Sequence, residues 1–192
     1  MKQQYQVFHE KLAAFIPEKR LISDPLRTLA YGTDASFYRL IPQIVVRVES
    51  ADEVSRIIQL ASADQIPVTF RAAGTSLSGQ AITDSVLIQL GDGWTNYEIN
   101  NDATTIALQP GVIGGHANKY LAPFNKKIGP DPASINAAKI GGIAANNASG
   151  MCCGTAQNSY RTLKCMKLVL ADGTQLDTGN ASSVAKFRQS HK

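Results

Sequence analysis

Residues 70–80, with the sequence FRAAGTSLSGQ, decide the fold expected for this chain. The segment begins with strand character and continues into a loop that holds two glycines, Gly74 and Gly79, and three hydroxyl side chains. Glycine accepts positive φ and lets the backbone approach a ligand, so successive N–H groups can converge on an anion. The segment favours a phosphate-binding loop, and an exposed turn rich in small residues is the structural alternative.

Two other nucleotide-binding motifs do not fit the loop. The spacing of Gly74 and Gly79 imitates a P-loop, but Gln80 and Ala81 stand where that motif needs lysine and then serine or threonine. Without them a kinase or ATPase lacks its phosphate charge partner and its metal ligand. A Gly-x-Gly-x-x-Gly fingerprint is absent as well, so a Rossmann NAD site is not supported.

A second segment of small residues follows about sixty positions later. It comprises residues 129–134, GPDPAS, and residues 140–150, IGGIAANNASG. Such residues fill little core volume, so a packed fold leaves space beside them for a flat ligand. A tight turn between elements is again the alternative. Backbone amides from both segments are expected to enclose one pyrophosphate.

The pattern around the first loop predicts a small parallel α/β layer. Residues 44–48 form a β-branched strand, and Ser50 with Glu53 forms a capping box at the start of a helix. Strands over residues 68–71 and 85–90 follow, and the crossover through the helix predicts a right-handed parallel pair.

The remaining elements predict an α+β second half. Before the layer, a helix over residues 5–16 leads into an irregular connection over residues 26–41. After it we expect a hairpin over residues 97–109, a helix from about residue 112 and a hairpin over residues 163–178 around Asp172-Gly173. Residues 182–187 resemble the capped start of a helix, so the chain is interpreted as a fragment. The expected divisions are 1–40, 41–93, 94–178 and 179–192.

The two loops together resemble the FAD-linked oxidases that share the flavin domain of p-cresol methylhydroxylase and vanillyl-alcohol oxidase. The resemblance covers about residues 41–178 and is strongest to FAD-binding, iron–sulfur-containing D-lactate dehydrogenases, with similarity also to the glycolate oxidase flavoprotein subunit. It implies an α+β fold with a small parallel α/β subdomain, followed by a mostly antiparallel α+β subdomain that is incomplete at the C-terminus.

Residue by residue, the resemblance implies cofactor contacts in both loops. The implied cofactor-binding residues are Arg71, Ala73, Gly74, Thr75, Ser76, Leu77, Ser78, Gly79, Gln80, Pro130, Asp131, Ser134, Ile140, Gly141, Gly142, Ala145, Asn146, Asn147 and Gly150. The sequence departs from the family at Ile143, Asn146 and Ser149, where asparagine, threonine and glycine are usual. Thr75 stands where covalent relatives carry histidine, which implies noncovalent FAD.

The resemblance also implies a reaction and places it outside this chain. It implies hydride transfer from the hydroxyl-bearing carbon of a 2-hydroxyacid, D-lactate first and otherwise glycolate or D-2-hydroxyglutarate, to FAD. Iron–sulfur clusters and a quinone or cytochrome would then receive the electrons. The substrate cap, catalytic histidine and cluster cysteines are expected beyond Lys192, so no catalytic residue is assigned here. A noncatalytic nucleotide-binding or assembly module that uses the same loops is the alternative.

Composition narrows the remaining possibilities. The 192 residues are 44% hydrophobic and carry a net charge of +4 from scattered lysines and arginines, which argues against nucleic-acid binding. Cys152, Cys153 and Cys165 fit neither a disulfide framework nor a metal site and are expected to be reduced. No signal peptide or membrane-spanning run is present, so we expect a cytoplasmic protein, with peripheral attachment to the inner membrane left open. His116 and Asp131 lack the partners of an acid–base site.

Overall fold

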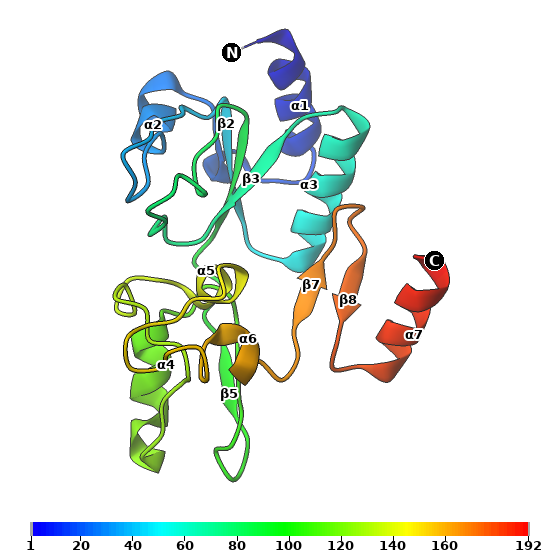
Figure 1. Ribbon diagram of the computed structural model, residues 1–192. Coiled ribbons are helices and arrows are strands. Elements are labelled where there is room, and N and C mark those ends of the chain that lie inside the picture. Colours follow the sequence, from blue (N-terminus) through cyan, green and yellow to red (C-terminus); the bar gives the residue numbers. More distant parts are fainter. Residues whose placement is uncertain (1, 192) are drawn as a thin grey trace.

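The computed structural model describes residues 2–191, and its first half is a four-stranded sheet covered by helices (Figure 1). The elements of this half are α1 (Gln3–Ala13), η1 (Glu18–Arg20), β1 (Leu21–Ile22), α2 (Pro25–Ala30), β2 (Ile44–Val48), α3 (Ala51–Ala63), β3 (Val68–Arg71) and β4 (Val86–Leu90). The predicted strands and the first two long helices are confirmed. The connection expected to be irregular contains α2, which Asp24 caps by accepting from the N–H of Arg27.

The sheet order is β1-β2-β4-β3, so the strands joined through α3 are not direct neighbours. Strand β4 lies between β2 and β3 and pairs in parallel with both, whereas β1 is antiparallel to β2. The parallel direction is therefore as predicted, but the expectation that residues 44–48 and 68–71 pair directly is wrong. Val86, Leu87 and Ile88 have no exposed surface, and this continuous apolar run suits a central strand covered on both faces.

Alternation along the strands builds the core. Phe8 and Leu12 of α1 and Ile57 of α3 pack on the face that presents Val46 and Ile88. The intervening residues Val45 and Leu87 point to the other face, where they meet Ile22 and Tyr31. This period of two is what a sheet with two covered faces requires.

Only half of the capping box at α3 forms. The Ser50 hydroxyl accepts from the N–H of Glu53 at 3.2 Å, as predicted. The Glu53 carboxylate, however, accepts from the N–H of Glu49 at 2.8 Å and pairs with Arg20 at 2.7 Å. The positive charge of Arg20 outweighs the return bond to Ser50 that a capping box would make.

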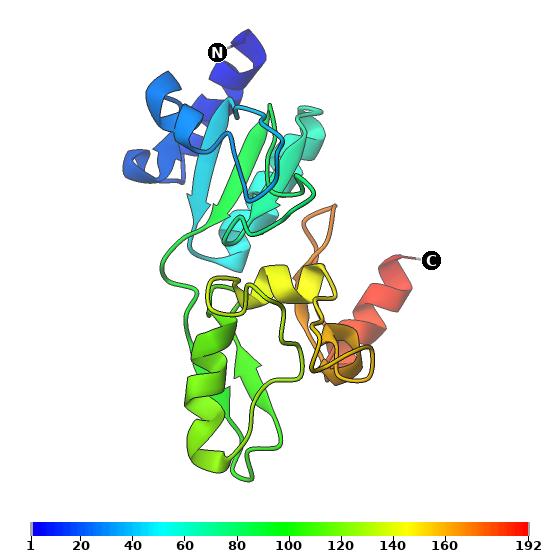
Figure 2. The same cartoon turned by 60° about the vertical axis from the view of Figure 1, so that its left-hand side comes forward.

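The second half contains short helices and two separate hairpins. Its elements are β5 (Tyr97–Ile99), β6 (Ile106–Leu108), α4 (Gly114–Leu121), η2 (Ala122–Phe124), α5 (Ile140–Ala145), α6 (Ser159–Thr162), β7 (Lys167–Val169), β8 (Gln175–Asp177) and α7 (Ala181–Ser190). Both predicted hairpins are antiparallel and are confirmed. Helix α7 is capped by Asn180, which precedes the expected start. Figures 1 and 2 place α5 between the four-stranded sheet and α4.

The β7–β8 hairpin returns to the first half and lies beside α3 (Figure 1). The side-chain amide of Gln175 donates to Asp52 at 2.6 Å, and the Ser55 hydroxyl donates to the carbonyl of Gly173. Val169 packs against the core of the sheet. The division boundaries proposed from the sequence remain predictions, and the contacts join this hairpin to α3.

Within residues 2–191, every helix is too short or too polar to cross a membrane.

Candidate functional site

The two small-residue segments meet at one cleft of about 290 Å³ at the end of β3. The loop after β3 supplies Ala73, Gly74, Thr75, Ser76 and Gln80, and the opposite wall supplies Ser134, Gly142, Ala145 and Asn146. A Cβ atom built at Gly142 would lie 3.8 Å from the Cβ of Ala72, an ordinary van der Waals distance. The structure thus brings together residues that lie about seventy positions apart in the sequence.

The first loop presents unpaired backbone donors. Gly74 and Gly79 have φ values of 72° and 71°, in the left-handed region that favours glycine. The loop curls around Ser76, whose hydroxyl accepts from the N–H groups of Ser78 and Gln80 at 3.2 Å each. Within residues 2–191 the N–H groups of Gly74, Thr75 and Ser76 bond to no protein acceptor. Backbone donors usually find partners, so these three are available to a ligand.

The segment that follows α2 supports the loop from outside. The Arg71 guanidinium donates to the carbonyls of Tyr31 at 3.0 Å and Thr33 at 2.7 Å. The N–H of Ala35 donates to the carbonyl of Gly74 at 3.0 Å. Arg71 therefore braces the loop through the protein backbone and does not line the cleft, although the sequence placed it among the cofactor contacts.

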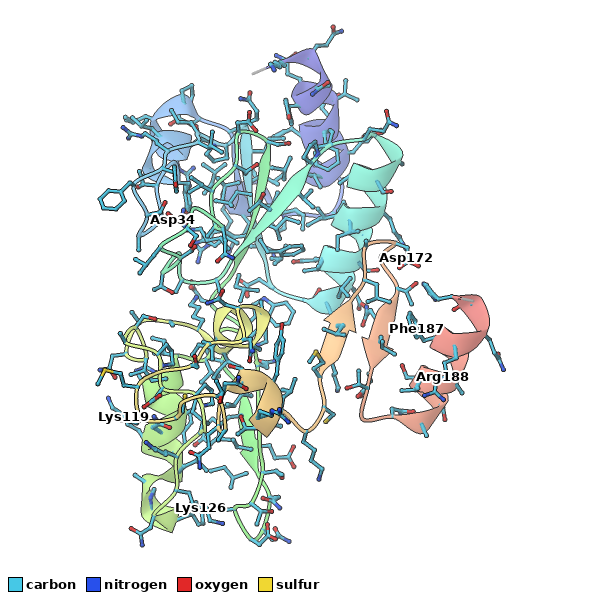
Figure 3. The ribbon with its side chains drawn as sticks, viewed as in Figure 1. Asp34, Lys119, Lys126, Asp172, Phe187 and Arg188 are labelled. Atoms are coloured by element: carbon cyan, nitrogen blue, oxygen red, sulfur yellow. The ribbon has the colours of Figure 1, made fainter. Side chains whose placement is uncertain are left out.

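Asp34 stabilises the C-terminal end of the same loop by hydrogen bonding. Its carboxylate accepts from the N–H of Ser36 at 2.9 Å and from the N–H of Ala81 at 3.3 Å (Figure 3). Burial raises the pKa of Asp34, but hydrogen bonds from Ser36 and Ala81 and the charge of Arg71 together outweigh it and keep the pKa below its usual value. The carboxylate is therefore ionised near neutral pH.

Hydrogen bonds within residues 131–160 stabilise the second wall. The Asp131 carboxylate accepts from the N–H of Cys153 at 3.2 Å, and the Cys153 sulfur accepts from the N–H of Gly150 at 3.0 Å. Asn147 accepts from the N–H of Tyr160 at 2.9 Å. The buried Ser159 hydroxyl lies 3.0 Å from the carbonyls of both Ile143 and Ala148. These bonds fix the backbone of residues 143–150, which include part of the cleft wall.

About half of the predicted contact residues do not line the cleft. Those outside it are Arg71, Leu77, Ser78, Gly79, Pro130, Asp131, Ile140, Gly141, Asn147 and Gly150. Ser78 and Gly79 instead line a shallower groove beside Tyr38 and Leu40. For Asp131, Asn147 and Gly150 the bonds described above show a supporting position.

The cleft also contains residues that were not predicted as contacts. They are Phe70, Ala72, Ala81, Pro132, Ala138, Lys139, Ile143 and Ala148. Most are small or apolar side chains that lie within or beside the motifs and carry no chemical signal of their own. Lys139 had a signal, since it is a cation that directly precedes the second motif.

The chemistry of the cleft suits a phosphate group. In the part of the chain that the structure describes, the lining holds no carboxylate and one cation, Lys139. The hydroxyls of Thr75 and Ser134 make no hydrogen bond within residues 2–191 and add to the free N–H groups. Donors without protein partners, in a lining that carries no competing negative charge, suit an anion such as a diphosphate.

A model of the FAD binding domain family matches residues 42–179. The chain belongs to this family. The matched range contains both walls of the cleft.

Relatives from several organisms are similar over most of this chain. D-2-hydroxyglutarate dehydrogenase of Haemophilus influenzae is 29% identical over 162 residues, which cover 81% of the chain and 16% of the relative. Glycolate oxidase subunit GlcD of Escherichia coli is 30% identical over 88% of the chain and 34% of the relative. The mitochondrial D-lactate dehydrogenase [cytochrome] 1 of Saccharomyces cerevisiae is 31% identical over 71% of the chain and 24% of the relative. The chain thus spans about a third or less of these relatives.

Solved structures show the same fold. p-Cresol methylhydroxylase superposes with a TM-score of 0.75 at 16% identity, over 93% of this chain and 36% of that one. An alkyldihydroxyacetonephosphate synthase superposes with a TM-score of 0.76 at 20% identity, over 95% of this chain and 38% of that one. The predicted p-cresol methylhydroxylase type of FAD-binding fold is confirmed.

Proposed function

We propose that the chain binds FAD without a covalent bond, with the FAD diphosphate in the cleft between the two loops. The observation that carries the proposal is a cleft whose described lining holds no carboxylate and includes Gly74, Thr75 and Ser76, three residues whose N–H groups have no protein acceptor. The N–H groups of Gly74, Thr75 and Ser76 would bind the phosphate oxygens from one wall. The hydroxyl of Ser134 would donate from the other wall. Gly142 has no side chain there and so leaves space for the ligand.

The parent activity that we propose is oxidation of a 2-hydroxyacid by a longer protein that contains this chain. Bound FAD supplies the acceptor for the two electrons that leave the hydroxyl-bearing carbon. The relatives are named for D-2-hydroxyglutarate, glycolate and D-lactate, which share a hydroxyl next to a carboxylate. D-lactate remains the first candidate substrate, with the other two acids as alternatives. Electrons would pass to iron–sulfur clusters and then to a quinone or cytochrome.

The role of this chain in that reaction is to hold and orient the cofactor. Among the described lining residues the one ionisable side chain is that of Lys139, and the lining offers no histidine or carboxylate to take the hydroxyl proton. His116 lies exposed on α4 and is not among the lining residues. The contacts to the substrate carboxylate and proton therefore come from outside the cleft described here.

The direct test is titration of the purified 192-residue chain with FAD, followed by equilibrium dialysis and flavin fluorescence. We expect one FAD per chain and competition by ADP, because ADP shares the diphosphate. After acid precipitation the yellow colour should appear in the supernatant, since Thr75 offers no ring nitrogen for a covalent link. Absence of binding overturns the proposal, and flavin that precipitates with the polypeptide overturns its noncovalent part.

A further inference from the structure

Among residues 2–191, Lys139 is the only residue of the cleft lining with an ionisable side chain. Its main chain is fixed on both sides. An isolated bridge pairs it with Ile113, and its carbonyl accepts from the N–H of Ile143 at 3.0 Å. The side chain therefore starts from a defined point at the wall opposite the Gly74 loop.

The charge of Lys139 has no protein partner in the part of the chain that the structure describes. The ion pairs formed within residues 2–191 use other lysines and arginines, and no carboxylate belongs to the cleft lining. Lys139 is partly buried, which weakens its contact with water. A cation in such surroundings attracts an anion more strongly than an exposed lysine does, because solvent screens it less.

The other donors in the cleft carry only partial charges. They are the N–H groups of the first loop and the hydroxyls of Thr75 and Ser134, which orient a phosphate without neutralising it. A diphosphate would bring about two negative charges into a cleft whose one compensating full charge is that of Lys139. A lysine ammonium on a flexible stem acts as a point charge and does not need one fixed bonding geometry.

We propose that Lys139 is the charge partner of the FAD diphosphate and accounts for the electrostatic part of cofactor affinity in this chain. The inference rests on the proposed function, because it concerns the same cleft. It assigns to this position a role that the sequence motifs did not include.

The experiment compares FAD dissociation constants of the wild-type chain with those of Lys139→Gln and Lys139→Arg at several KCl concentrations. We expect Lys139→Gln to bind FAD about tenfold or more weakly at low salt, as loss of a charge-assisted hydrogen bond predicts. Its affinity should also depend less on KCl, because one ion pair fewer is screened. Lys139→Arg keeps the charge and should remain within about threefold of the wild type.

Lys119→Gln is the matched control. Lys119 is an exposed residue of α4 that does not line the cleft, and its replacement changes the net charge equally (Figure 3). Thermal melting of each variant without FAD should show an unchanged fold.

Wild-type affinity and salt dependence in Lys139→Gln would overturn the inference and leave the proposed function standing. An equal loss in Lys119→Gln would also overturn it, because the effect would then be one of overall charge. Absence of FAD binding by the wild-type chain would overturn the proposed function and this inference with it.

Discussion

Gly79 and Gly142 illustrate two different reasons for a glycine at the site. Gly79 has a φ of 71°, and a Cβ atom there would lie 2.9 Å from the ring carbon Cδ2 of Tyr38. Gly142 has no such constraint, since its added Cβ would only contact Ala72 at 3.8 Å. The first glycine permits the backbone conformation of the loop, whereas the second leaves space in the cleft.

Replacement of Gly79 by valine should affect stability and binding together. A branched side chain in the left-handed region costs roughly 1–2 kcal/mol, and the contact with Tyr38 adds to this. We expect a lower free energy of unfolding in urea and lower FAD occupancy, while the far-ultraviolet circular dichroism stays close to that of the wild type. Wild-type stability and full occupancy would show that the loop is an ordinary turn.

Replacement of Gly142 by alanine should separate the two effects. Because Gly142 lies in α5 and its Cβ position is open, the unfolding free energy should stay the same or rise by roughly 0.4–1 kcal/mol. The added methyl group reaches into the cleft toward Ala72, so the FAD dissociation constant should rise about tenfold. Unchanged affinity, measured by fluorescence titration, would place the diphosphate away from α5.

Asp34 makes the support of the first loop sensitive to acid. Its folded pKa is lowered, so its contribution to stability is present above the unfolded pKa of about 3.9 and is lost as pH falls through the folded value. We expect Asp34→Asn to be less stable than the wild type by a constant amount between about pH 8 and 5. The difference should shrink below about pH 4, as urea denaturation at each pH would show. A difference that grew toward low pH would contradict the assignment.

At the scale of elements, the β7–β8 hairpin shows how a distant segment is held on the sheet layer. It contacts α3 through the Gln175 to Asp52 bond and through the close approach of Gly173. Gly173 has a φ of 83°, and a Cβ atom there would lie 2.6 Å from Cγ of Gln59 and 2.9 Å from the carbonyl of Ser55. The turn thus fits α3 only without a side chain.

Gly173→Ala should therefore detach the hairpin. Amide hydrogen exchange should become faster over residues 167–177, while β2 and β4 keep their protection, because the hairpin is a separate two-stranded sheet. Gly154→Ala is the control, since Gly154 has a φ of 52° but no atom within 4 Å of the added Cβ. Equal exchange changes around both sites would mean that backbone strain, and not contact with α3, holds the hairpin.

At the scale of the whole molecule, the chain covers 16% to 34% of the length of the relatives described above. It therefore corresponds to only a part of each of these proteins. We predict that the purified chain, saturated with FAD, will not oxidise D-lactate, glycolate or D-2-hydroxyglutarate with a dye acceptor. The lining residues that the structure describes include one cation and no histidine or carboxylate, so they cannot orient a substrate carboxylate and accept a proton together. Loss of oriented substrate binding forfeits roughly 7–11 kcal/mol of barrier reduction.

The comparison is a steady-state assay of this chain beside a longer relative, D-2-hydroxyglutarate dehydrogenase of Haemophilus influenzae, with its own substrate under identical conditions. Turnover by the chain within about tenfold of the longer protein would place the catalytic groups inside residues 1–192. The assignment of cofactor binding alone to this part would then be wrong.

Local sequence determined the elements and the nature of the site. A β-branched run predicts β2, the capping pattern of Ser50 and Glu53 predicts the start of α3, and paired glycines predict a phosphate loop, because each signal lies within a few neighbouring positions. The resemblance of both loops to a known flavin domain predicts the fold without reference to any long-range contact.

Only the tertiary structure decided what the residues of those motifs do. The insertion of β4 between β2 and β3 depends on which strand is apolar on both faces, and that is a property of the complete sheet. Arg71 lies in the motif but bonds to carbonyls of Tyr31 and Thr33, about forty positions earlier. Lys139 lies outside the predicted contacts yet lines the cleft. Such roles arise from long-range contacts. The local sequence does not determine which distant part of the chain a side chain will contact.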